Sequence, residues 1–222
     1  MGKEREIKLS IEDLPALRRA LAKLGALVAA PRVHELNVVF DTPAFDLAKH
    51  EHLLRIRTET AGGSGGRTSG PGRSALVTFK RPVSAAGRNG KDERHKVREE
   101  IELEVSDEKA LARIFGALGL SAWFRYEKLR TTFRLPASRA WAKGLLIALD
   151  ETPIGVFLEL EGPANAIDRA AQALGFETRD YILANYMVLY REYCLRRGEA
   201  LGDMTFTKKK RRATSAKSKN FS

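Results

Sequence analysis

The sequence predicts a mainly antiparallel β protein of the α+β class, with helices inserted between some of its strands. Eight segments alternate apolar and polar residues with a period of two, the pattern of half-buried strands. Four other segments repeat apolar residues at helical spacing. Hydrophobic residues make up 43% of the 222 residues, which suits a folded core, and no apolar run approaches the ~18 residues that a membrane span needs.

The eight expected strands are distributed between residues 3 and 162. They lie at residues 3–9, 33–41, 53–60, 74–80, 95–105, 124–134, 145–151 and 155–162. The Gly- and Ser-rich residues 61–72 predict a flexible connection, and residues 83–94 predict a second polar loop. Because the strand pattern resumes after each loop, residues 1–206 are expected to form one domain.

The expected helices begin after polar capping residues, and three of them end in Leu-Gly. Ser10 and Ser106 are expected to cap the first two helices, because a Ser hydroxyl can accept a free N–H of the first turn. The first three helices are expected to end at Gly25, Gly119 and Gly175. The fourth is expected to span residues 181–197. Helices therefore follow the first, the fifth and the last strand.

The formal net charge of +11 is concentrated at the C-terminal end. Residues 207–222 contain seven Lys and Arg and no acid, so subtracting +7 from +11 leaves +4 for residues 1–206. This Ser-, Thr- and Lys-rich segment is expected to be a disordered tail that contacts nucleic acid only weakly. One cysteine, Cys194, rules out an internal disulfide, and the charged first residues predict no secretory signal, so a cytoplasmic location is expected.

Charged side chains of like sign recur on one face of the expected strands. Residues i and i+2 of a strand share a face. Glu-x-Glu pairs occur in the first, fifth and eighth strands, and Arg-x-Arg or Lys-x-Arg pairs occur in the third and sixth. A solvated face is the ordinary explanation for one such strand. Like charges repel, so their repetition over the set of strands indicates groups that bind ions of the opposite sign.

The residue types select the ligands. Carboxylate oxygens without a cluster of Cys or His favour Mg²⁺ or Mn²⁺ over zinc. Inward-facing Arg and Lys favour phosphate oxygens, on which Arg can fork. Metal and cations together on a chain of phosphates catalyse phosphoryl transfer by positioning and charge neutralisation. The pattern therefore predicts a metal-dependent site for a polyphosphate.

Motifs along residues 4–190 occur in a recognisable order. They are Glu4-Arg-Glu-Ile-Lys8, Phe40-Asp-Thr-Pro43, Leu54-Arg-Ile-Arg57, Thr78-Phe-Lys80, Arg98-Glu-Glu-Ile-Glu102, Glu127-Lys-Leu-Arg130, Ala148-Leu-Asp150, Leu158-Glu-Leu-Glu161 and Asn185-Tyr-Met-Val-Leu189. A lone Glu-x-Glu-x-Lys would be weak, but the ordered set is specific. It resembles the CYTH superfamily, also called the triphosphate tunnel metalloenzymes.

The resemblance implies a closed tunnel of eight antiparallel strands that holds two divalent metal ions and a triphosphate. The metal candidates are Glu4, Glu6, Glu100, Glu102, Asp150, Glu159 and Glu161. The candidates for binding the triphosphate are Lys8, Arg55, Arg57, Lys80, Arg98, Lys128 and Arg130. Glu4, Glu6 and Lys8 are expected to carry catalysis. Glu104 extends the Glu run of the fifth strand, which leaves open the pair that faces the metal.

Several functions are compatible with this lining. The first is hydrolysis of inorganic triphosphate or a small organic triphosphate such as thiamine triphosphate, because no base-reading group is evident. A class IV-type adenylyl cyclase is the alternative, in which the ribose 3′-hydroxyl attacks the α-phosphate of ATP. A non-catalytic polyphosphate- or nucleotide-binding module and an RNA-binding protein led by the tail are further alternatives. No membrane partner is expected, and a homodimer is one compatible oligomeric state.

Overall fold

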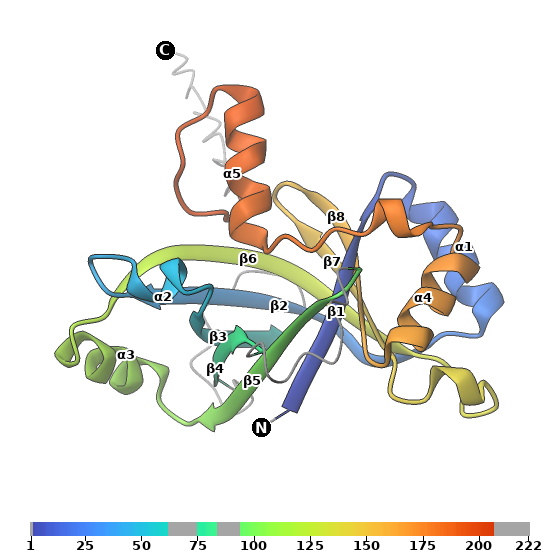
Figure 1. The fold of residues 1–222 in the computed structure, drawn as a ribbon, viewed down its shortest axis with the longest axis horizontal. Helices are drawn as coiled ribbons and strands as arrows, with labels where there is room; N and C mark the ends of the chain where they lie inside the picture. Colours follow the sequence, from blue (N-terminus) through green and yellow to red (C-terminus); the bar gives the residue numbers. More distant parts are fainter. Residues whose placement is uncertain (1, 62–74, 84–93, 207–222) are drawn as a thin grey trace, which may run out of the picture.

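The computed structural model describes residues 2–61, 75–83 and 94–206. Its eight described strands pair antiparallel and close into a barrel in the order β1-β5-β4-β3-β2-β6-β7-β8, which confirms the predicted fold class (Figure 1). The strands are β1 (Gly2–Ile11), β2 (Leu27–Asp41), β3 (Leu53–Ala61), β4 (Ala75–Pro82), β5 (Lys96–Val105), β6 (Ser121–Arg134), β7 (Leu146–Thr152) and β8 (Gly155–Glu161). Most of both predicted loops and all of the predicted tail lie outside the described residues.

Five helices lie among the described residues. They are α1 (Leu14–Leu24), α2 (Asp46–Lys49), α3 (Glu108–Ala117), α4 (Ala164–Ala173) and α5 (Tyr186–Arg197). In Figure 1, α1 and α4 lie together beside β1, β7 and β8, and α5 lies over β6. None of the described helices is both long enough and apolar enough to cross a membrane.

Both predicted serine caps were wrong, by three residues at α1 and by one at α3, because an aspartate further along caps each helix. Ser10 lies within β1, and the Asp13 carboxylate accepts the N–H of Ala16 at 2.8 Å to start α1. At α3 the carboxylate of Asp107, rather than Ser106, accepts two backbone N–H groups, at 2.9 and 2.8 Å. An ionised carboxylate at this position also interacts favourably with the positive end of the helix dipole.

Other boundaries also differ from the prediction. The last helix begins five residues later than expected, because residues 178–180 form a 3₁₀ turn and Asn185 caps α5 by accepting the N–H of Val188 at 3.0 Å. The single-turn helix α2 was not predicted, since four residues are too few to show helical periodicity. β2 starts at Leu27, six residues before the predicted start at residue 33. Its first part contains Pro31, which cannot donate to a ladder, and its pairing with β6 shifts register there.

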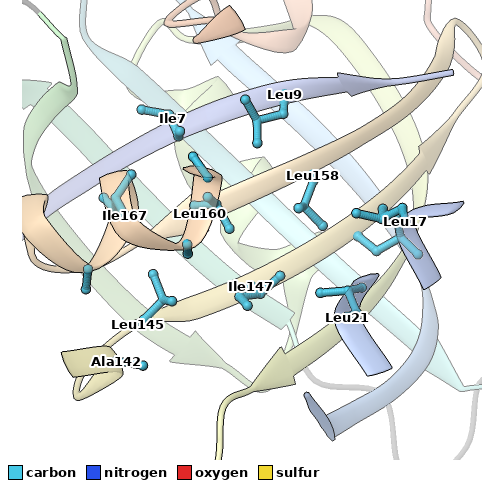
Figure 2. Packing of buried hydrophobic residues seen from close by; sticks show 14 of the residues in the cluster. Ile7, Leu9, Leu17, Leu21, Ala142, Leu145, Ile147, Leu158, Leu160 and Ile167 are labelled. Atoms are coloured by element: carbon cyan, nitrogen blue, oxygen red, sulfur yellow. The ribbon is translucent and has the colours of Figure 1, made fainter. Parts of the chain in front are cut away.

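The main apolar core lies outside the barrel wall (Figure 2). The outward side chains of β1, β7 and β8 pack against α1 and α4, and the fully or almost fully buried ones include Ile7, Leu9, Ile147, Leu149, Leu158, Leu160, Leu17, Leu21 and Ile167. Burying one such side chain contributes about 1.5–3 kcal/mol. Because side chains alternate along a strand, fixing Ile7 and Leu9 outside places Glu4, Glu6 and Lys8 inside.

A second apolar cluster lies on the inner side of the strands, at the start of α5. It consists of Val39, Phe124, Tyr126, Phe157, Tyr186 and Met204. Met204 belongs to a segment that runs beside β6, where it exchanges backbone hydrogen bonds of 2.9 Å with Arg125 and Glu127. β7 pairs with β6 only from Leu129 onward, so this segment covers the part of β6 that β7 does not reach.

Candidate active site

The interior of the barrel is a cavity of about 1510 Å³. Side chains from all eight strands and from the start of α5 line it. Every predicted site residue except Asp150 lies on the lining: Glu4, Glu6, Lys8, Arg55, Arg57, Lys80, Arg98, Glu100, Glu102, Lys128, Arg130, Glu159 and Glu161. The structure therefore brings together groups that the sequence spreads over more than 150 residues.

One part of the wall is rich in carboxylates around Lys80. The Lys80 ammonium lies 2.5 Å from Glu4 Oε1 and 2.9 Å from Glu100 Oε1. Burial and then Glu4 raise the pKa of Glu161 to about 7, against the effect of Lys80. The raised pKa therefore reflects burial of Glu161 first and the nearby carboxylates second, with Lys80 offsetting only part of both effects.

Glu6 lies among cations. Its Oε1 is 3.4 Å from Lys8 Nζ, 3.4 Å from Arg98 Nη2 and 3.3 Å from Lys96 Nζ. Burial alone would raise the pKa of Glu6, but the attraction of Lys8 and the neighbouring lysines lowers it below its ordinary value. Burial likewise opposes the charge of Lys8, yet Glu159, at 3.3 Å, and Glu6 raise the Lys8 pKa. Both side chains are therefore ionised.

Asp150 lies behind the lining and is fully buried. Lys128 donates to Asp150 Oδ2 at 2.9 Å, and Arg130 donates to Oδ1 and Oδ2 at 2.6 Å each. The Tyr186 hydroxyl donates to Oδ2 at 2.7 Å. Arg130 also donates to Glu159. In this structure Asp150 therefore holds two cations in place, and its role as a metal ligand stays a prediction.

The arginines of β3 are supported in a different way. Arg55 donates to the Tyr126 hydroxyl at 2.9 Å and to Thr78 Oγ1 at 3.2 Å, and Thr78 in turn donates to Glu102 at 2.9 Å. Arg57 Nη2 lies 3.9 Å from Glu102. Glu102 therefore lies beside Thr78 and Arg57, at the part of the wall that carries the arginines of β3.

The donor set fits a divalent metal in its chemistry. The carboxylates of β1, β5 and β8 offer hard oxygens, and Glu4 Oε2 is buried without a hydrogen-bond partner among the described residues. No group of three or more Asp, Glu, His or Cys within the described ranges is already gathered into a metal-type arrangement. Lys80 lies between Glu4 and Glu100 instead, so a metal ion held by this pair would have to take the place of the ammonium.

Sequence reasoning missed several residues of the site. Glu35 on β2 is 1% exposed, and although burial would raise its pKa, Lys128, Arg130 and Arg57 lower it to about 2. It escaped notice because β2 carries no like-charged partner two residues away. Tyr186, which lies 5.4 Å from both Lys8 and Lys128, was part of a quoted motif but had no role assigned to it.

Comparison with known proteins decides the family. The sequence matches the CYTH domain over residues 2–181. The chain belongs to the CYTH family. This membership supports the expectation of metal-dependent triphosphate chemistry and leaves the particular reaction open.

Individual relatives of this CYTH protein are distant. A Methanocaldococcus jannaschii protein that carries a provisional adenylate cyclase name is 27% identical over 172 residues, which are 77% of this chain and 83% of the relative. A solved structure from Vibrio parahaemolyticus, also provisionally named an adenylate cyclase, has a TM-score of 0.65 at 15% identity and covers 88% of this chain and 99% of its own. The PH1819 protein of Pyrococcus horikoshii has a TM-score of 0.65 at 22% identity, covering 85% and 98%. The two structures share the fold.

Proposed function

We propose that this CYTH protein hydrolyses a triphosphate, inorganic or small and organic, with Mg²⁺ or Mn²⁺ inside the barrel. The observation that supports this most is that carboxylates suited to bind metal and Lys and Arg side chains suited to bind phosphate, here called phosphate-type cations, line one cavity. Glu4 and Glu6 are 7% and 6% exposed, and Arg55 and Lys128 are 7% and 2% exposed. Burying so many charges is costly in free energy, and a ligand that uses both signs gives a reason for it.

The cations are suited to hold phosphate oxygens. Asp150 fixes Lys128 and Arg130, and Tyr126 and Thr78 fix Arg55. Because these supports orient the side chains before substrate arrives, little side-chain freedom is lost on binding. The guanidinium groups can each contact two phosphate oxygens.

The carboxylates are suited to hold two divalent ions. The metal candidates remain Glu4, Glu6, Glu100, Glu102, Asp150, Glu159 and Glu161. A bound metal supplies charge neutralisation and an activated water. Lys8 and its neighbours keep Glu6 ionised, the form in which a carboxylate binds metal. In the hydrolysis, the oxygen of water forms a bond to the terminal phosphorus and the water gives up a proton to solvent, while the bond from that phosphorus to its bridging oxygen breaks, which gives orthophosphate and the shortened chain.

The test is phosphate release from tripolyphosphate and thiamine triphosphate with Mg²⁺ or Mn²⁺. Glu4→Gln and Glu6→Gln should abolish turnover while circular dichroism shows an intact fold. Glu99→Gln is the matched control, since Glu99 lies on the same strand as Glu100 but pairs outside the cavity with Arg81 at 2.7 Å. No release by the folded wild type with either metal would refute the proposal.

An adenylyl cyclase is the second candidate. Two observations favour it: the provisional name of the Methanocaldococcus jannaschii relative and the aromatic side chains of Trp123, Phe124 and Tyr126 on the cavity lining. Trp123 Nε1 is buried without a hydrogen-bond partner among the described residues, so it is a donor that a base could use. Product identification after incubation with ATP separates the two reactions, since a cyclase forms cyclic AMP and diphosphate.

A further inference from the structure

A buried carboxylate that the proposed chemistry does not use lies among the phosphate-type cations. Glu35 Oε2 is 3.4 Å from Lys128 Nζ, and Oε1 is 3.7 Å from Arg130 Nε and 3.9 Å from Arg57 Nη1. Glu35 reaches all three because β2 lies between β3, which carries Arg57, and β6, which carries the other two. Its side chain is 1% exposed, so water screens these interactions little.

The contacts of Glu35 differ in kind from those of Asp150. Glu35 Oε2 has no hydrogen-bond partner among the described residues, and the two guanidinium groups lie beyond hydrogen-bond distance from Oε1. Asp150, by contrast, accepts hydrogen bonds of 2.6–2.9 Å from Lys128 and Arg130. Glu35 therefore offsets positive charge without occupying the N–H groups that would hold phosphate.

We propose that Glu35 is a positioning residue that sets the net charge of the triphosphate clamp, defined here as Arg57, Lys128 and Arg130. This inference rests on the proposed function, because it assumes that the clamp binds a triphosphate. The carboxylate keeps three neighbouring cations together while the cavity holds no ligand. It also opposes the attraction between the clamp and a polyanion, which limits how tightly substrate and products are held.

Two effects of opposite direction follow from removing the charge of Glu35. The ligand-free protein loses stability, because three buried cations lose a shared counter-charge. Triphosphate binding becomes tighter, because the ligand no longer meets a buried anion of its own sign at the clamp. A carboxylate that only supported the fold would instead lower stability and weaken binding together, since a loosened site is less well ordered for its ligand.

The experiment compares Glu35→Gln with Glu59→Gln. Glutamine keeps the shape and removes the charge. Glu59 is the matched control, because it contacts the same Arg57, with Oε1 3.3 Å from Nε, but its side chain is 37% exposed. The affinity for tripolyphosphate is measured by calorimetric titration of metal-free protein, thermal unfolding is followed with and without tripolyphosphate, and KM is measured with Mn²⁺.

For Glu35→Gln we expect a lower Tm without ligand, recovery of most of that loss with tripolyphosphate, and a Kd about tenfold lower than wild type, with KM falling in parallel. Glu59→Gln should change the Kd less than about twofold, because solvent screens its charge. An unchanged or higher Kd in Glu35→Gln, or an equal change of Kd in both variants, would overturn the inference. If wild type binds tripolyphosphate but turns over no triphosphate, only the proposed hydrolysis fails, and the Kd comparison still tests Glu35.

A second comparison covers the case in which Glu35→Gln does not fold. Arg57→Gln is compared with the double variant Arg57→Gln/Glu35→Gln, which removes one charge of each sign and so restores the balance. The double variant should bind tripolyphosphate about tenfold more tightly than Arg57→Gln. Equal or weaker binding by the double variant would contradict the role given to Glu35.

Discussion

Replacing Asp150 by Asn is expected to destabilise the metal-free protein by about 3–5 kcal/mol, the usual cost of breaking a buried ion pair by removing one partner. The substitution keeps the size of the side chain but removes the charge that Lys128 and Arg130 share. It also presents an amide N–H₂ group to donors that need an acceptor. Asp150 is fully buried, so water cannot take its place.

The assay is urea denaturation of metal-free protein, with thermal unfolding as a second measurement. For a chain of this size a loss of 1 kcal/mol lowers the Tm by about 2–4 °C, so a fall of roughly 6–20 °C is expected. An unchanged m-value would show that unfolding remains two-state and that the lower midpoint reflects a lower free energy of unfolding. If Asp150 acted only as a metal ligand among like charges, its neutralisation would leave the metal-free protein as stable as before or more stable. That result would refute the reasoning from its contacts.

Three further predictions concern the rest of the barrel. Because the folded state raises the pKa of Glu161 to about 7 from 4.5, it retains a proton that the unfolded chain releases, so metal-free stability should fall as pH rises from about 4.5 to 7 and level off above. The free energy of unfolding is measured by urea denaturation at several pH values for wild type and for Glu161→Gln, and the difference between the two should change from about pH 4.5 to 7. A difference that is the same at every pH would contradict the prediction. Tyr186→Phe should cost about 1 kcal/mol in the same assay, because it removes one hydrogen bond to Asp150 but keeps the ring beside Lys8 and Lys128; a loss as large as that of Asp150→Asn would be inconsistent with this. Ile7→Ala should cost about 2–5 kcal/mol and Ile101→Ala less than about 0.5 kcal/mol, because the first side chain is fully buried under α4 and the second is 49% exposed; similar losses would count against a core outside the barrel.

The sequence predicted the strands well because the interior of this barrel is polar and its outer core is apolar. In β1, Ile7 and Leu9 alternate with Glu6 and Lys8, and the period of two sorts them to opposite sides of the wall. The same pattern separates Leu158 and Leu160 from Glu159 and Glu161. Like-charged pairs then marked the inner face, the family resemblance supplied the candidate site residues, and the structure places all of these except Asp150 on the cavity lining.

What the sequence did not predict depends on contacts between distant residues. Glu35 is a single charge on its strand, and only the closure of the barrel brings it to Arg57 and Lys128. The separation of Asp150 from the lining follows from hydrogen bonds to β6 and α5, which no spacing in the sequence encodes. The wrong cap of α1 had a local cause. Ser and Asp are both favourable capping residues, and only the end of β1 decides between Ser10 and Asp13.

Ion pairs inside the cavity balance many of the charges of the candidate site. Lys80 offsets Glu4 and Glu100, while Asp150 and Glu35 offset Lys128 and Arg130. In the absence of ligand these charged groups thus have partners of opposite sign. Metal and triphosphate together would replace these internal partners, which gives a reason to expect that each ligand promotes binding of the other.

The most direct test of the central claim is the release of orthophosphate from tripolyphosphate by wild type and by Glu6→Gln, measured with Mg²⁺ or Mn²⁺ and again after chelation of the metal. We predict turnover by the metal-loaded wild type, none after chelation, and none by Glu6→Gln, although Glu6→Gln remains folded. Turnover by Glu6→Gln at the wild-type rate, or no turnover by folded wild type with either metal, would contradict a catalytic metal and triphosphate site inside the barrel.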